Sequence, residues 1–360
     1  MNVTKKIMIA AGGTGGHVFP GLAVAQVLRA RGHEVVWMGT PDSFEAHTVP
    51  KHGIEVRFVR VKGLRGKGAL SWLGAPLRLL RALRDALAVV RSERPDVLLG
   101  MGGFAAGPGG LAAWLTRRPL VIHEQNSVAG LTNRLLARIA RRVLEAFPQT
   151  FAGAETVGNP VRPGFAELAD PAQRIGARGT SGAPGQVLVI GGSLGAKALN
   201  EIVPAALALI PATQRPLVRH QGGRTLEAAQ AAYARHGVSG EVTAFIDNMV
   251  AAYGWADLVI CRAGASTVAE LAAAGCAALL VPYPYAVDDH QTRNGQYLVD
   301  AGAALMVPED ILTPELLAEM LEGLLARRAQ LATMAQAARK SAWPNAVNVI
   351  ADACLQAAGA

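Results

Sequence analysis

At 360 residues the chain is about twice the length of a typical domain, so we expect two domains and a sizeable core. Its three cysteines, Cys261, Cys276 and Cys354, have spacings that fit neither a zinc site nor a disulfide framework. The start lacks a secretory apolar region, and no segment carries the ~20 uninterrupted apolar residues of a membrane-spanning helix. These features predict a cytoplasmic protein that is not integral to a membrane.

The net charge of +8 is unevenly distributed. Residues 1–162 carry 22 Lys and Arg against 10 Asp and Glu, whereas residues 163–360 carry 13 against 17. The imbalance predicts an anionic partner for the first half only, either nucleic acid or anionic lipid. Aromatic residues of the kind that stack on bases are sparse there, so we do not expect nucleic acid.

The first motif, Gly12-Gly13-Thr14-Gly15-Gly16-His17, follows the apolar run 7–11 and precedes a helical pattern. This order predicts a strand, a glycine loop and a helix start, which together attract a phosphate. The spacing is not that of the dinucleotide fingerprint, so a nicotinamide enzyme is not the natural interpretation. His17 lies where a general base would face a bound substrate, although a histidine that merely caps the helix explains the motif equally well.

Strand-like runs then alternate with helical patterns, which is typical of a parallel sheet covered by helices. The strands expected in the first half, after the one at 7–11, are Glu34–Met38, Val56–Val59, Val97–Met101, Leu120–His123 and Val143–Phe147.

The segment from Arg57 to Arg94 is strongly basic, with ten basic and two acidic residues. Four apolar residues in it have the spacing of a helical core stripe: Leu80, Leu83, Leu87 and Val90. Three others, Trp72, Leu73 and Leu79, lie beside Arg78, Arg81 and Arg84. An apolar edge bordered by arginine fits an anionic membrane surface, and the alternative is a solvated basic helix with its Trp in the core.

Two further motifs follow strands of the first half. One is a second glycine loop at 100–110, and the other is His123-Glu124-Gln125-Asn126, at a strand end where parallel sheets place ligand-binding residues. Asn126 can donate and accept hydrogen bonds at once, as sugar hydroxyls require, but it could equally cap a turn or helix.

The domain boundary is expected after Arg162, because the run 166–186 is rich in Gly, Pro and Ser and predicts a linker. We therefore expect a first domain at 1–162 and a second at 163–342. The final helix, from about Ala346, is expected to join the first domain as part of 343–360.

The second half opens with a near repeat of the first motif, since Val187–Ile190 is followed by Gly191-Gly192-Ser193. Two similar halves of this kind predict a site in a cleft that both face. Further strands are expected at Leu217–His220, Val242–Ile246, Leu258–Cys261, Ala278–Val281 and Ala304–Val307.

The segment from Arg262 to Glu270 predicts a small-residue loop that enters a helix. Glu270 could accept hydrogen bonds from the two hydroxyls of a ribose. Alternatively, its negative charge could only complement the helix dipole. Asp288, Asp289 and His290 could hold a metal ion, but no D-x-D spacing occurs, so we expect no metal-bridged diphosphate.

Taken in order, these motifs resemble the MurG family, the bacterial glycosyltransferases that form lipid II, with Gly158-Asn159-Pro160-Val161-Arg162 among the matching stretches. The resemblance runs from Ile7 to at least Gln291. It implies a GT-B fold of two Rossmann-like α/β domains, the acceptor at the first and the UDP-sugar mainly at the second. It also implies an inverting transfer of N-acetylglucosamine from UDP-N-acetylglucosamine to the muramoyl 4-hydroxyl of lipid I, in the peptidoglycan synthesis that supports cell shape and division.

The resemblance further implies a peripheral position on the inner face of the cytoplasmic membrane, no cofactor, and other cell-wall synthesis proteins as partners. His17 is implied as the general base. The implied donor-binding residues are Thr14, Gly15, Gly16, Asn126, Arg162, Ser193, Ile246, Ala265, Ser266, Thr267, Val268, Ala269, Glu270 and Gln291. The loop from Tyr283 to Gln291 departs from relatives that have two adjacent glutamines, which leaves His290 as an alternative to Gln291.

Three alternatives share parts of this pattern. A glycosyltransferase for soluble acceptors or a UDP-sugar 2-epimerase needs the same nucleotide pocket, and a non-catalytic nucleotide-sugar-binding membrane scaffold needs no base. Dependence of UDP release on a lipid-linked acceptor discriminates among them.

Overall fold

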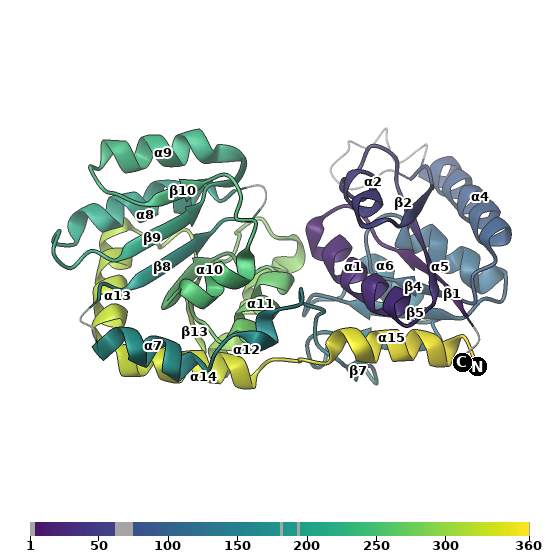
Figure 1. Cartoon of the computed structure of the whole chain (residues 1–360). Coiled ribbons are helices and arrows are strands. Elements are labelled where there is room, and N and C mark those ends of the chain that lie inside the picture. Colours follow the sequence, from purple (N-terminus) through teal and green to yellow (C-terminus); the bar gives the residue numbers. More distant parts are fainter. Residues whose placement is uncertain (1–3, 62–74, 181–182, 193–194, 360) are drawn as a thin grey trace. The chain divides into compact units, whose positions relative to one another are not determined.

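The computed structural model describes residues 4–61, 75–180, 183–192 and 195–359. The chain divides into two compact units, Met1–Arg162 with Trp343–Ala360, and Pro163–Ala342 (Figure 1). Each unit is a parallel sheet with helices on both faces, so the predicted α/β class of two doubly wound domains is confirmed. Among the helices in these ranges, none is long and apolar enough to cross a membrane.

The sheet of the first unit has the strand order β3-β2-β1-β4-β5-β6-β7, with every pair parallel. Its strands are β1 (Lys6–Ala10), β2 (Glu34–Gly39), β3 (Glu55–Phe58), β4 (Val97–Gly100), β5 (Leu120–Glu124), β6 (Arg142–Glu145) and β7 (Glu155–Thr156). The helices are α1 (Gly15–Ala30), α2 (Phe44–Thr48), η1 (Val49–His52), α4 (Ala75–Glu93), α5 (Ala106–Leu115), α6 (Leu131–Leu136) and α15 (Ala346–Ala357).

Both faces of this sheet are buried because its strands are apolar at successive positions. Along β1, Ile7 and Ile9 point into one core with α1 and α15, whereas Met8 and Ala10 point into a second core with α4 and α5. The C-terminal helix α15 completes the first of these cores through residues such as Ile350 and Cys354.

The core stripe expected on α4 is partly wrong. Leu80 is exposed, and the buried side chains are Ala82, Ala86 and Val90, with Leu83 and Leu87 half-buried. Small residues face the core here because α4 packs closely on α5.

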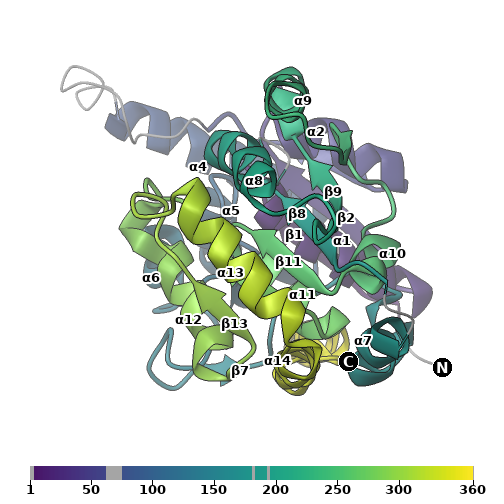
Figure 2. The same cartoon turned by 90° about the vertical axis from the view of Figure 1, so that its left-hand side faces the viewer.

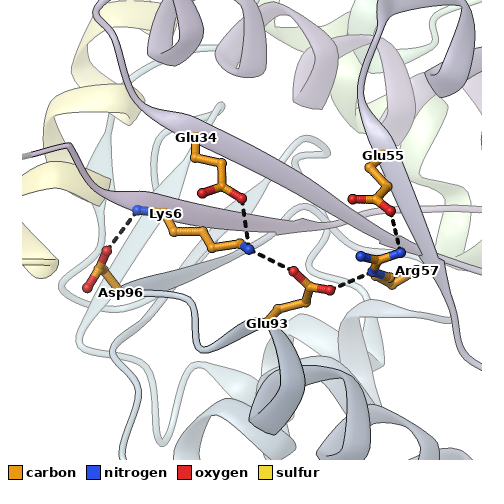
Figure 3. Close-up of polar contacts among 6 residues, drawn as sticks. All are labelled: Lys6, Glu34, Glu55, Arg57, Glu93 and Asp96. Atoms are coloured by element: carbon orange, nitrogen blue, oxygen red, sulfur yellow. Dashed lines mark hydrogen bonds and ion pairs between the residues drawn. The ribbon is translucent and has the colours of Figure 1, made fainter.

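An ion-pair chain ties the amino-terminal ends of the first three strands together (Figure 3). Lys6 Nζ lies 2.8 Å from Glu34 Oε1 and 2.7 Å from Glu93 Oε2, and Glu93 also accepts from Arg57 Nε. Arg57 in turn pairs with Glu55.

The second unit has the strand order β10-β9-β8-β11-β12-β13, again all parallel. Its strands are β8 (Gln186–Ile190), β9 (Leu217–Gln221), β10 (Glu241–Thr243), β11 (Leu258–Cys261), β12 (Ala277–Leu280) and β13 (Ala304–Met306). The helices are η2 (Phe165–Glu167), α7 (Pro171–Thr180), α8 (Lys197–Leu209), η3 (Gly223–Thr225), α9 (Leu226–Arg235), α10 (Met249–Trp255), α11 (Ala265–Ala274), η4 (Val287–Asp289), α12 (His290–Asp300), α13 (Pro314–Ala326) and α14 (Arg328–Lys340). In Figure 2, α8 and α13 lie side by side over the sheet.

The linker expected at 166–186 is wrong, because this stretch contains the end of η2 and the helix α7. Arg174 on α7 donates hydrogen bonds to the carbonyls of Tyr253, Gly254, Ala274 and Gly275. α7 also packs along α14. These tertiary contacts stabilise a helix whose Gly and Pro content predicts irregular structure.

Candidate functional site

In each unit, glycine-rich or small-residue motifs follow the two strands between which the strand order reverses, β1 and β4 in the first unit and β8 and β11 in the second, where parallel sheets bind ligands. In the first unit, the glycine loop of His17 follows β1, the second glycine loop follows β4, and His123–Asn126 ends β5 and continues past it. Because β1, β4 and β5 are neighbours, three motifs separated by up to 108 residues meet at one edge.

The first glycine loop is held by Glu45, a residue that the sequence analysis did not single out. The Glu45 carboxylate accepts from the backbone N–H of Gly13 at 3.0 Å and from the backbone and hydroxyl of Thr40 at 3.0 and 2.8 Å. Burial alone would raise the pKa of Glu45, but these hydrogen bonds outweigh it and lower the pKa. Its partners are two backbone N–H groups and a hydroxyl, which no sequence pattern marks.

The second glycine loop touches the first through two residues with positive φ. Gly103 has φ +81°, and a Cβ on it would lie 2.0 Å from the carbonyl oxygen of Gly12. Gly102 has φ +91°, and a Cβ there would lie 3.0 Å from Nδ1 and Cε1 of His17. Only glycine at positions 102 and 103 lets the second loop approach the first loop and the imidazole of His17 so closely.

His17 is the first member of a hydrogen-bonded series that the sequence did not reveal. Its Nδ1 lies 2.7 Å from Oε1 of Gln125, whose Nε2 lies 3.0 Å from Nδ1 of His123. Nε2 of His123 lies 3.0 Å from the carbonyl oxygen of Gly158. His17 is half-buried, whereas Gln125 and His123 are buried, and burial lowers the pKa of His123 to about 4.

The remaining predicted residues of the first unit lie at the same edge. Thr14 is the N-cap of α1 but makes no side-chain capping bond, and the first turn contains Gly15 and Gly16 and no acid. The N–H groups of a helix start so arranged suit an anion. Asn126 donates through its backbone N and Nδ2 to Glu124 Oε1, at 3.0 and 3.3 Å.

Arg162 is placed near the start of α1 by a contact with an aromatic ring. Its guanidinium carbon lies 5.6 Å from the ring centroid of Phe19, two residues after His17. Arg162 thus brings a positive charge toward the end of α1 that carries His17.

In the second unit, the predicted residues Ala265 to Glu270 form the first turns of α11, directly after β11. The N-cap is Gly264, which has no side chain to cap the helix, and no acid lies in the first turn. The Oγ of Ser266 is buried and has no hydrogen-bond partner within the described ranges. Ser193, which follows the neighbouring strand β8 in the sequence, lies outside the described residues.

Glu270 projects from α11 and is nearly fully buried at 8 % exposure. Its Oε2 accepts a hydrogen bond of 3.3 Å from the hydroxyl of Tyr253. Burial, together with the charge of Glu270, raises the pKa of Tyr253 well above its usual value, so the phenol remains a donor. Tyr253 is a further functional candidate that sequence reasoning missed.

The other two residues predicted to bind the sugar-nucleotide donor, Gln291 and Ile246, do not lie on α11. Gln291 lies in the first turn of α12 after β12, and its Oε1 accepts from the backbone N–H of Tyr283 at 3.0 Å. Ile246 lies half-buried in the loop after β10, which β9 and β8 separate from β11. The strand that precedes Ile246 is therefore not adjacent to β11, the strand that leads into α11. Within the described ranges no group of three or more His, Cys, Asp or Glu side chains is placed to hold a metal ion.

The predicted membrane-contact residues belong to α4, apart from Trp72 and Leu73, which lie outside the described residues. Arg78, Leu79 and Arg81 are exposed on α4. The neighbouring helix α5 adds exposed Trp114 and Leu115, which the sequence analysis missed. The exposed large apolar residues of α4 and α5 are Leu77, Leu79, Leu80, Trp114 and Leu115.

Comparison with known proteins matches both units to family models. Residues 7–145 match the glycosyltransferase family 28 N-terminal domain, and residues 186–350 match the glycosyltransferase family 28 C-terminal domain.

Two proteins that are similar to this chain over nearly their whole length have the same enzyme name. The chain is 55 % identical to the UDP-N-acetylglucosamine–N-acetylmuramyl-(pentapeptide) pyrophosphoryl-undecaprenol N-acetylglucosamine transferase of Marinobacter nauticus, over 98 % of each chain. It is also 55 % identical to the Alkalilimnicola ehrlichii transferase of the same name, over 99 % of this chain and 100 % of the other. The crystal structure of Acinetobacter baumannii MurG superposes with a TM-score of 0.85 at 42 % identity, over 98 % of this chain and 99 % of that one.

Proposed function

The chain belongs to glycosyltransferase family 28 and, within it, to the MurG family, and from this we propose that it converts lipid I to lipid II. It transfers N-acetylglucosamine from UDP-N-acetylglucosamine to the 4-hydroxyl of N-acetylmuramic acid in undecaprenyl-pyrophosphoryl-MurNAc-pentapeptide. The observation that carries this proposal is the identity of 55 % over nearly the whole length of transferases so named. The two-unit GT-B fold is shared with the A. baumannii protein.

The first unit supplies the base. Nε2 of His17 takes the proton of the 4-hydroxyl as its oxygen attacks the anomeric carbon from the face opposite UDP. The new C–O bond forms as the bond from the anomeric carbon to the β-phosphate oxygen breaks, which inverts the configuration. The half-buried position of His17 at the edge of its sheet supports this role.

The second unit binds the donor nucleotide. The start of α11 and the hydroxyl of Ser193 hold the diphosphate, and the buried hydroxyl of Ser266 supplies a further polar group at that helix start. Glu270, oriented by Tyr253, accepts the ribose hydroxyls, and the backbone of Ile246 contacts uracil.

Three residues complete the donor contacts. Arg162 neutralises the charge that develops on the departing diphosphate, as a preorganised cation does without reorganisation at the moment of reaction. Asn126 and Gln291 contact the transferred sugar. The remaining amide donor of Gln291 suits this role, since its oxygen is already bonded to Tyr283.

The acceptor is a membrane lipid, so the protein must reach a bilayer surface. We propose that α4 and α5 provide the contact, with Leu79 and Trp114 entering the interface and Arg78 and Arg81 pairing with anionic headgroups on the cytoplasmic face. Trp72 and Leu73, which precede α4 in the sequence, are proposed to enter the interface as well. Other cell-wall synthesis proteins that make lipid I or consume lipid II are expected partners at this surface.

The test measures UDP released from UDP-N-acetylglucosamine by the purified protein, with EDTA present, with and without a short-chain lipid I analogue. Release that depends on the analogue is expected and supports metal-independent transfer. Release that ignores the analogue contradicts the proposal in favour of an epimerase or hydrolase. No release in either sample, with UDP binding intact, contradicts it in favour of a binding scaffold.

A further inference from the structure

We propose that Gln125 and His123 are positioning residues that fix the tautomer of His17, so that Nδ1 carries the proton and Nε2 keeps the lone pair. The tautomer follows from hydrogen bonds within the first unit alone. Only the identity of the proton that Nε2 accepts, that of the muramoyl 4-hydroxyl, rests on the proposed function.

The protons can be assigned from the far end of the series, where His123 contacts a backbone carbonyl. Nε2 of His123 lies 3.0 Å from the carbonyl oxygen of Gly158, and a carbonyl oxygen can only accept. Nε2 of His123 therefore carries a proton. Burial lowers the pKa of His123 to about 4, so the ring is neutral near pH 7 and its Nδ1 is an acceptor.

The orientation of Gln125 is fixed by two acceptors on the side of His123. Its Nε2 lies 3.0 Å from Nδ1 of His123 and 3.1 Å from the His123 carbonyl oxygen. Both sites require a donor, so the amide nitrogen faces His123, and the amide oxygen faces His17. The backbone carbonyl alone decides this orientation, even without the imidazole.

The amide oxygen then determines the tautomer of His17. Oε1 of Gln125 lies 2.7 Å from Nδ1 of His17 and can only accept, so Nδ1 of His17 is the donor. A neutral imidazole has one N–H group, so Nε2 of His17 is left with its lone pair. A partner on Nδ1 sets a catalytic histidine in serine proteases in the same way, with a carboxylate there in place of an amide.

The surroundings keep this arrangement in place. Gln125 is 1 % exposed, and its backbone oxygen accepts from Nδ2 of Asn159 at 2.8 Å. Gly102 closes the other side of the ring, since a Cβ there would lie 3.0 Å from Nδ1 of His17. A neutral amide on Nδ1 orients the ring without placing the negative charge of a carboxylate beside it.

The first experiment reads the tautomer directly in the wild-type protein, without substrate. Long-range ¹⁵N–¹H correlation spectra near pH 8 distinguish the protonated from the bare ring nitrogen of each histidine. The His17 signals are assigned by their loss in His17→Asn, and exposed His47 and His52 serve as internal references. We expect His17 to be protonated on Nδ1 and His123 on Nε2. A His17 protonated mainly on Nε2, or a mixture like that of the references, overturns the proposal.

The second experiment compares Gln125→Leu with Gln125→Glu. Leucine removes the acceptor, and we expect kcat to fall about 10- to 100-fold with the KM for UDP-N-acetylglucosamine within about twofold. Glutamate keeps an acceptor for Nδ1 but favours the imidazolium, so we expect partial activity with the acid limb of the kcat profile moved up by about one pH unit. Gln173→Leu, at an exposed position of α7, is the control and should match the wild type.

The outcomes separate this inference from the proposed function. If the two Gln125 variants lose activity equally with an unshifted pH profile, Gln125 only supports the loop and the positioning role is wrong. If wild-type protein shows the expected tautomer but no transfer to the lipid I analogue, the proposed function fails while the tautomer assignment stands.

Discussion

Gly103 approaches Gly12 so closely that a Cβ on Gly103 would lie 2.0 Å from the Gly12 carbonyl oxygen. Gly103→Ala must therefore displace one glycine loop from the other and adopt a strained positive φ. We expect a loss of about 2 kcal/mol or more in the free energy of unfolding, measured by chemical denaturation, and a large loss of turnover. Gly107→Ala, whose Cβ would meet only Thr132 at 3.5 Å, is the control. Equal stability of the two variants would contradict the close packing.

His17→Ala removes the proposed base and leaves the fold of the first unit in place. We expect turnover to fall by about two to four orders of magnitude, as is usual for loss of a general base. Binding of UDP, measured by calorimetry, should persist within about threefold. Turnover like that of the wild type would exclude His17 as the base.

Glu270→Ala should weaken donor binding, because a carboxylate that accepts two ribose hydroxyls is lost. We expect the KM for UDP-N-acetylglucosamine to rise about 10- to 100-fold. Tyr253→Phe, which removes only the hydrogen bond that orients Glu270, should raise it less. Glu319→Ala, on the exposed side of α13, is the matched control. An unchanged KM in Glu270→Ala would refute the ribose contact.

The ion pairs of Glu93 with Lys6 and Arg57 should make the free energy of unfolding vary with pH in the acidic range. The hydrogen bond from Lys6, followed by that from Arg57, lowers the pKa of Glu93 below its usual 4.5. Its contribution to the free energy of unfolding is therefore present above pH 4.5 and is lost as the pH falls through the lower pKa of the folded state. Glu93→Gln should cost about 1–3 kcal/mol at pH 7 and progressively less below pH 4.5, by urea denaturation. A penalty independent of pH would contradict the ion pairing. Glu201→Gln, at an exposed pair, should cost little at any pH.

The surface of α4 and α5 should bind anionic vesicles. Arg78→Glu with Arg81→Glu replaces two attractive charges by repulsive ones, and we expect binding in a sedimentation assay to fall at least tenfold. Turnover of a water-soluble acceptor analogue should not change. Arg224→Glu with Arg235→Glu, on the second unit, is the control of equal charge. Equal losses in both pairs would indicate that only net charge matters.

Much of the fold could be predicted because buried parallel strands are continuous apolar runs. The predicted Leu258–Cys261 is β11 as observed, and the predicted Glu34–Met38 is one residue shorter than β2. The helix α7 could not be predicted, because it depends on hydrogen bonds from Arg174 to carbonyls that lie 79–101 residues further along the chain.

The candidate site was predicted as separate motifs but not as a connected arrangement. Their positions after strands identify His17 and Asn126 as candidates, but nothing in the sequence distinguishes Gln125. Its contact with His17 spans 108 residues and exists only because β1, β4 and β5 are adjacent. Strand order is a property of the whole sheet, and no local pattern in the sequence encodes it.

The helix α15 closes a core whose other members lie before residue 158, although the second unit intervenes in the chain. During synthesis on the ribosome, the face of the first sheet that α15 covers therefore stays exposed until the last residues of the chain emerge. The second unit is continuous in sequence and can complete its core earlier. A nascent chain that stalls or terminates shortly before Ala346 would leave Ile350 and Cys354 missing from that core, which makes truncated products targets for chaperones and proteases.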